Sequence, residues 1–229
     1  YGLMPMDMPT RCDGCGAVFT VEHALGCKVG GQVGARHNDL KHEWTSLCTQ
    51  ALGKASVSDK PLIKNSQDVC NAGDQNRPVT ADLRGDIGVH GFWKRGSSCI
   101  FDVRVTDMDQ PSQRGTPPAK VLEKHEREKK AKYLAPCLES QRSFTPLVFS
   151  VDGLMGQETK AAVKRLASHL ASKWSQRYSV VCGYLRSRLA MALVRATGQC
   201  LRAERCPIWR AEQLVWSGGD GIPLVMERE

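Results

Sequence analysis

Four residues near the N-terminus have the types and spacing of a metal site. Cys12 and Cys15 are separated by two residues, His23 follows after seven more, and Cys27 after another three. The first pair, with glycines beside it, can form a tight knuckle, and residues four apart on a helix share a face. Three thiolates and one imidazole make a closed tetrahedral zinc site with no open position for substrate. The spacing therefore predicts structural zinc that stabilises a segment too small to fold alone.

Two other interpretations of this segment stay open. The cysteines could be a chance cluster of free thiols, because many spacings are zinc-like. His37 and His42 are further imidazoles nearby, and either could replace one ligand. The chain has ten cysteines, and those outside the cluster are scattered. Scattered cysteines are typical of reduced, partly buried thiols rather than of a disulfide framework.

Asp86 and Asp102 are the second candidate site. Residues 99–105 alternate as a strand does, and a glycine-containing turn connects them to a short strand at 87–89, so a hairpin is predicted. A carboxylate inside the second strand is costly unless it faces a polar or metal-filled site. Carboxylates on adjacent strands can share Mg²⁺, which polarises phosphate oxygens and lowers the pKa of bound water. Alternatively, Asp102 faces solvent on an edge strand; Asp82 is a rival for the first metal position.

Residues 119–134 form a strongly helical, charge-rich stretch after a proline-rich loop. Lys129, Lys132 and Tyr133 lie within one turn, so they can direct a cation and a phenol towards the strand carboxylates. Many charges in this stretch can also form pairs four residues apart, such as Glu126 with Lys130. A solvated helix face is therefore the alternative interpretation.

The remaining elements provide the framework for these residues. Apolar periodicity predicts a helix opening at Arg36, a strand at 144–151, and helices over 157–178 and 179–202. We expect four parts: a zinc-knuckle segment (1–35), a core (36–151), a helical extension (152–206) and a loose tail (207–229). Arginines on the last helix could contact phosphates, although scattered arginines are more often surface residues: Arg186, Arg188, Arg195 and Arg202.

Composition limits the class of protein without assigning a function. The chain has 229 residues, of which 41% are hydrophobic and 24% charged, as in ordinary globular domains. A net charge of +8 suits a polyanionic partner, although many solvated surfaces have a similar excess. No apolar run reaches the roughly 18–20 residues that a membrane helix needs. No signal peptide is visible and the chain starts with Tyr1, so we interpret it as a fragment of a longer polypeptide.

Taken together, these motifs resemble the C-terminal region of certain non-LTR retrotransposon reverse transcriptase polyproteins. That region has a zinc knuckle followed by a restriction-like endonuclease of the PD-(D/E)xK superfamily. The resemblance covers residues 11–135 and rests on an ordered set of motifs: the four-ligand cluster, Arg36-His37-Asn38, Arg84-Gly85-Asp86, Phe101-Asp102-Val103-Arg104-Val105 and Lys129-x2-Lys132-Tyr133.

The resemblance implies an α/β (α+β) fold with a small mixed sheet flanked by helices, and metal-dependent nicking of target DNA that primes reverse transcription. Asp86 and Asp102 match the metal-binding acids, and Lys129 and Tyr133 match the helix-borne lysine and tyrosine. Arg104 takes the place of the superfamily's lysine, and Gly85 that of the usual proline.

The implied partners are target DNA, the element's RNA and the rest of the polyprotein, without a membrane, inside the cell and in the nucleus. Zinc would be structural and Mg²⁺ catalytic. The alternative function is a catalytically inactive, zinc-stabilised nucleic-acid-binding module.

Overall fold

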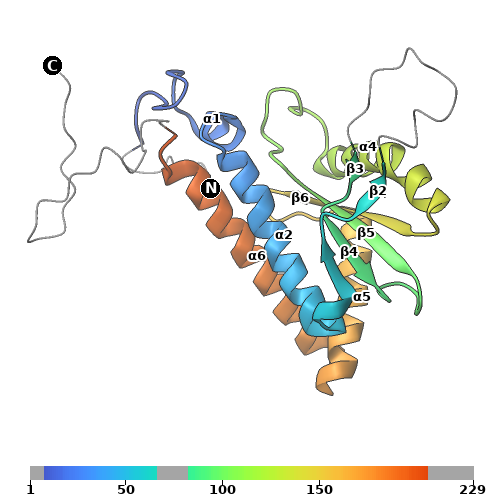
Figure 1. The fold of residues 1–229 in the computed structure, drawn as a ribbon. Coiled ribbons are helices and arrows are strands. Elements are labelled where there is room, and N and C mark those ends of the chain that lie inside the picture. The colour runs from blue at the N-terminus through green and yellow to red at the C-terminus, as the bar shows by residue number, and fades with distance from the viewer. Residues whose placement is uncertain (1–7, 66–81, 206–229) are drawn as a thin grey trace, which may run out of the picture.

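A four-stranded mixed sheet forms the centre of the computed structural model, which describes residues 8–65 and 82–205 (Figure 1). Its strands are β1 (Val57–Asp59), β4 (Ile87–His90), β5 (Ser98–Thr106) and β6 (Ser143–Ser150), in the order β1-β4-β5-β6. Neighbouring strands are antiparallel except for the parallel pair β5 and β6. A separate two-stranded sheet pairs β2 (Leu62–Lys64) with β3 (Leu83–Arg84). The predicted mixed α/β architecture is confirmed.

Helices cover both faces of this sheet. They are α1 (Val21–Gly26), α2 (Gln32–Leu52), the short 3₁₀ helix η1 (Lys54–Ser56), α4 (Pro118–Glu139), α5 (Gln157–Trp174) and α6 (Tyr178–Arg202). Because side chains alternate along a strand, Phe101 and Val103 of β5 face the α2 and α5 side, whereas Ile100 packs with Tyr133 and Cys137 of α4. Asp102 has the same parity as Ile100 and therefore faces α4.

The larger hydrophobic core extends across the boundary that we expected near residue 151. Leu166 of α5 and Leu185 of α6 belong to the same buried cluster as Trp44 of α2, Phe101 of β5 and Leu147 of β6. Without α5, the apolar face of β6 would remain exposed to water, and α6 in turn covers apolar surface of α2 and α5. The last two helices are therefore part of the core rather than an appended extension. The expected tail at 207–229 lies outside the described residues.

Individual helix ends differ from the sequence expectation for local reasons. Helix α5 ends at Trp174, four residues early, because Ser175 adopts a left-handed backbone conformation with φ 53°. Helix α4 continues to Glu139, with Pro136 inside its last turns. Over the described stretches 8–65 and 82–205, no helix is both long and apolar enough to span a bilayer.

Candidate functional site

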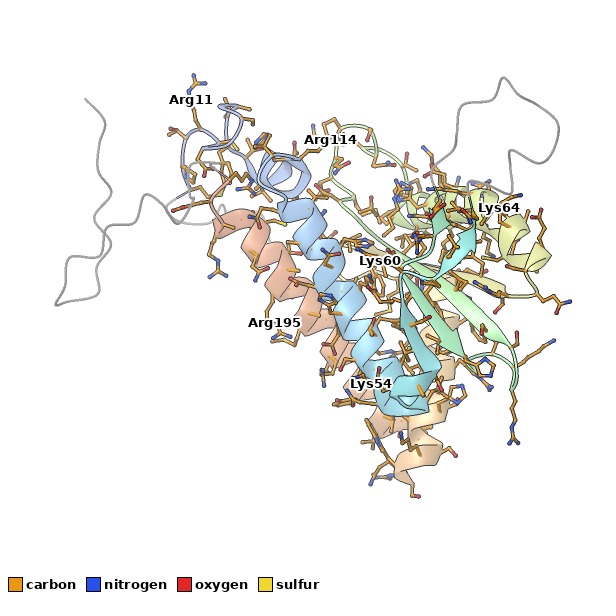
Figure 2. The ribbon with its side chains drawn as sticks, in the orientation of Figure 1. Arg11, Lys54, Lys60, Lys64, Arg114 and Arg195 are labelled. Atoms are coloured by element: carbon orange, nitrogen blue, oxygen red, sulfur yellow. The ribbon has the colours of Figure 1, made fainter. Side chains whose placement is uncertain are left out.

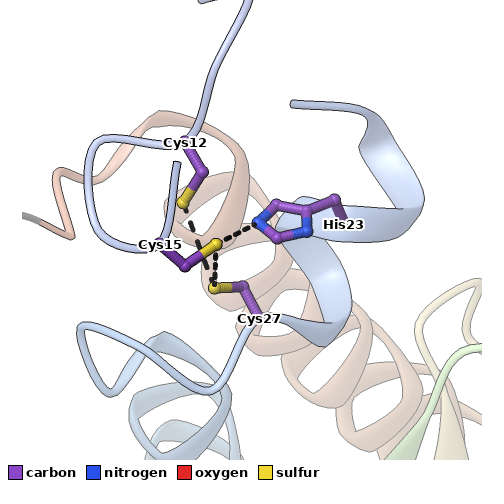
Figure 3. A group of neighbouring side chains, drawn as sticks. All are labelled: Cys12, Cys15, His23 and Cys27. Carbon is purple, nitrogen blue, oxygen red and sulfur yellow. Dashed lines mark hydrogen bonds between the residues drawn. The ribbon is translucent and has the colours of Figure 1, made fainter. Parts of the chain in front are cut away.

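The four predicted zinc ligands come together into one cluster (Figure 3). Their ligand atoms all lie within 4.8 Å of one another. Cys15 Sγ is 3.4 Å from His23 Nε2, and Cys27 Sγ is 4.0 Å from Cys12 Sγ and 3.9 Å from Cys15 Sγ. This group can hold a metal ion. His37 and His42 lie outside it, so neither replaces one of the four.

Two local structures place these ligands. Gly16, with φ 74°, closes the knuckle by donating its N–H to the Cys12 carbonyl at 2.8 Å. Helix α1 then begins after Thr20, whose hydroxyl oxygen accepts the His23 N–H at 3.1 Å. His23 and Cys27 are one helical turn apart and point towards the knuckle, as their spacing predicted.

The environment of Cys12 favours a thiolate. Burial raises its pKa, but hydrogen bonds from the backbone N–H groups of Cys15 and Gly14 and from His23 outweigh this effect and hold the pKa at about 6. Burial raises the pKa of Cys27, and the neighbouring Cys12 and Cys15 raise it further. Three thiolates this close together need a cation to offset their mutual repulsion.

The two strand carboxylates also meet, because of the hairpin register. Asp86 immediately precedes β4, whose first residue Ile87 pairs with Phe101, and the Asp86 N–H donates to the Phe101 carbonyl at 3.0 Å. Asp102 follows Phe101 in β5. The two carboxylates are close enough for Asp86 to raise the pKa of Asp102, and Lys129 of α4 lowers the pKa of Asp86.

Asp86 is held by hydrogen bonds at both oxygens. Its Oδ1 lies 3.3 Å from His37 Nε2 on α2, and its Oδ2 accepts the Val103 N–H at 2.7 Å. Burial raises the pKa of Asp86, but His37 and the Val103 N–H outweigh burial and keep the pKa below its ordinary value. Asp86 is therefore ionised at neutral pH and has a fixed orientation.

Asp102 is the more buried carboxylate, with 6% of its side chain exposed. It forms an ion pair with Lys129 of α4, and Tyr133, one turn later, lies beside it and lowers its pKa. Burial raises the pKa of Asp102, against the attraction of Lys129, and nearby Asp86 raises it further. Burial and Asp102 together raise the pKa of Tyr133. The Tyr133 ring stacks on Phe144 at a centroid distance of 5.2 Å.

The structure separates the predicted site residues into two groups. Asp86, Asp102, Lys129 and Tyr133 converge, as expected from the hairpin and the helix. Arg104 does not join them, because its guanidinium donates to Glu128 at 2.7 Å.

The rival acid Asp82 forms an ion pair with Arg84, whose Nη2 lies 3.2 Å from its Oδ2. His37 is the site residue that sequence reasoning missed, since we weighed it only as a substitute zinc ligand. The sequence signal that could have identified it is its place in the Arg36-His37-Asn38 motif of the resemblance.

Comparison with models of known protein families and with curated proteins gives no match for this chain. The function must therefore be argued from the two clusters and from the ordered motifs.

Proposed function

We propose that the chain is the metal-dependent DNA endonuclease portion of a retrotransposon polyprotein. The observation that carries the proposal is the β4–β5 hairpin, which brings Asp86 close to Asp102 and to Lys129, the ion-pair partner of Asp102. The resemblance assigns these same three positions to the nuclease. In the intact element the nick in target DNA would prime reverse transcription in the nucleus, with the element's RNA and the rest of the polyprotein as partners.

The donor set at the carboxylates fits Mg²⁺. This ion usually binds through one or two protein carboxylates, keeps several waters and takes further oxygens from substrate phosphates. Asp86 and Asp102 are the residues that would hold it. When bound there, Mg²⁺ would polarise a phosphate and lower the pKa of a coordinated water.

The protein's own side chains have separate tasks in this proposal. Lys129 neutralises Asp102 in the absence of substrate, and its ammonium is placed to stabilise negative charge that develops on a phosphate. His37 orients Asp86 from α2. Tyr133 is buried beside Asp102 with its ring packed on Phe144, so it holds that carboxylate in place.

We also propose that the cysteine and histidine cluster binds structural zinc. Zinc bonds of about 2.1–2.3 Å in tetrahedral geometry place neighbouring ligand atoms about 3.5–3.8 Å apart. Three of the six separations, at 3.4–4.0 Å, are near these values, and all six are within 4.8 Å. All four positions are taken by protein, so zinc would stabilise the fold and take no part in hydrolysis.

A supercoiled-plasmid nicking assay tests the endonuclease. We expect Mg²⁺- or Mn²⁺-dependent nicking by the parent chain and a loss of about 100-fold or more in Asp86→Asn and in Asp102→Asn. Glu123→Gln is the matched control, because Glu123 is an exposed carboxylate on α4. Nicking by Asp102→Asn at the parental rate would show that the assigned roles are wrong.

One observation favours the alternative, a catalytically inactive nucleic-acid-binding module. Arg104 stands where the superfamily has its lysine, and it pairs with Glu128 instead of turning to the carboxylates. Arginine also has poorer proton chemistry than lysine. Under this alternative, DNA binding weakens steeply with salt while nicking stays at background with every divalent metal.

A further inference from the structure

A concave surface lies between α5, α6 and the loop that precedes α5. This cavity has a volume of about 460 Å³. Three cationic side chains line it, Lys160 and Lys164 of α5 and Arg186 of α6, and its lining includes no aspartate or glutamate. Its volume falls within the range of about 300–1,000 Å³ that is typical of ligand pockets.

The three cations are available to a ligand. All are solvent-exposed, and none takes part in the ion pairs found among residues 8–65 and 82–205. Other arginines of α6 are placed differently. Arg188 pairs with Glu43 at 2.8 Å, and Arg195 projects from the side of α6 that faces away from the sheet (Figure 2). Arg186 is therefore the one we single out from the basic residues of this helix.

Between these cations the cavity is apolar. Leu154, Met155, Val163 and Ala190 line it, and Leu154 is 46% exposed although it is a large hydrophobic residue. A ligand that fits must combine anionic groups with a flat or apolar part. A single-stranded nucleotide does so, because its unpaired base is free to cover apolar side chains while its phosphates reach the cations. In a duplex the base is stacked and cannot enter.

We propose that this cavity, between Lys160 and Lys164 on α5 and Arg186 on α6, binds single-stranded nucleic acid, with phosphates on the three cations and a base against Leu154 and Met155. The site shares no residue with the carboxylate pair or with the metal cluster. It therefore goes beyond the endonuclease proposal, and it stands even if the carboxylates prove inert.

Binding measurements on the full chain test this site without reference to cleavage. The probes are fluorescein-labelled 12-nucleotide oligo(dT), 12-nucleotide oligo(U) and a 12-base-pair duplex, read by fluorescence anisotropy in zinc-containing buffer without Mg²⁺. The test variant is Lys160→Ala/Lys164→Ala/Arg186→Ala. The matched control is Lys54→Ala/Lys94→Ala/Arg95→Ala, which removes the same charge from exposed positions elsewhere.

Counterion release gives the expected size of the effect. For a single strand, log K falls linearly with log[salt], with a slope of about 0.7 per phosphate contact, so three contacts give a slope of about 2. Raising NaCl from 50 to 200 mM should thus weaken parental binding about 20-fold through this site, and the test variant should lose that part of the salt dependence. At 50 mM NaCl we expect a loss of at least 10-fold for the single strands, with much smaller losses for the duplex and for the control variant.

Three further results decide the interpretation. Lys160→Arg/Lys164→Arg/Arg186→Lys keeps the charges and should retain binding, which separates recognition from misfolding. Oligo(dT) and oligo(U) together show whether DNA or RNA is the better ligand. The proposal is overturned if the test and control variants lose affinity equally, or if a 12-residue oligoglutamate competes as well as the single strands do.

Discussion

The ion pair between Lys129 and Asp102 makes a quantitative prediction about stability. Lys129→Met keeps most of the side-chain volume but leaves a carboxylate with 6% exposure without its cation. Removing one partner of a buried pair usually costs about 3–5 kcal/mol. Lys129 itself is 22% exposed, so water can partly replace it and the lower part of this range applies.

Protonation of Asp102 sets an upper limit on this cost. Protonating an acid whose unfolded pKa is near 4 costs about 4 kcal/mol of free energy at pH 7 and about 1.4 kcal/mol at pH 5. Burial already raises the pKa of Asp102 in the folded parent, and loss of the lysine raises it further. A raised carboxyl pKa destabilises the fold above the unfolded pKa, and this destabilisation is relieved as pH falls. We therefore expect a loss of about 2–3 kcal/mol at pH 7.5 and of about 1 kcal/mol at pH 5.

Urea unfolding measures the difference in free energy of unfolding between parent and variant at each pH. Parent and variant are always compared at the same pH, so the effect of pH on the rest of the fold cancels. The double variant Lys129→Met/Asp102→Asn should recover most of the loss, since the buried charge is gone. A loss below about 0.5 kcal/mol at pH 7.5, or one that does not change with pH, would refute a buried pair at this position.

Three further predictions concern other parts of the fold. If the four-ligand cluster holds structural zinc, treating the protein with a chelator should lower Tm by about 5 °C or more, and re-adding zinc should restore Tm. An unchanged melting curve would contradict a structural role. Gly85→Pro introduces the residue usual in the resembling family and should lower the free energy of unfolding in urea by about 2–3 kcal/mol. A Cβ at this position would lie 2.3 Å from the Ile100 side chain, and proline would remove the N–H that Gly85 donates to the Pro61 carbonyl. Equal or higher stability would refute this packing. Glu126→Ala should lower the free energy of unfolding by about 1–2 kcal/mol, since Glu126 accepts the Glu158 N–H at the start of α5 at 2.9 Å. Glu126→Gln should cost less, because glutamine keeps an acceptor oxygen. Equal losses in the two variants would argue against this helix cap.

Local patterns in the sequence were sufficient where the site depends on one hairpin or one helix. Alternation in residues 99–105 and the turn before them predicted the hairpin that brings Asp86 and Asp102 close together. The helical spacing of Lys129 and Tyr133 predicted that both would point the same way. These predictions needed no knowledge of how distant segments pack.

The features that the sequence did not predict depend on contacts between distant segments. His37 reaches Asp86 because α2 packs across the sheet, and no periodicity within α2 reveals that neighbour. Arg104 turns to Glu128 because α4 crosses beside β5, and the motif alone could not distinguish this pairing from a catalytic position. Leu166 and Leu185 read as parts of amphipathic helices, but periodicity does not say which apolar surface they cover.

Helix α2 physically connects the metal cluster to the carboxylate pair. It begins at Gln32, five residues after Cys27, and carries His37 in its second turn. Further along, Leu40 and Trp44 anchor it in the core, so its orientation is fixed even without a metal. A metal bound by the four-ligand cluster would therefore restrain mainly the first turns of α2, where His37 holds Asp86. Removal of a metal bound there should consequently weaken the positioning of Asp86 more than that of Asp102, which Lys129 and Tyr133 hold from α4.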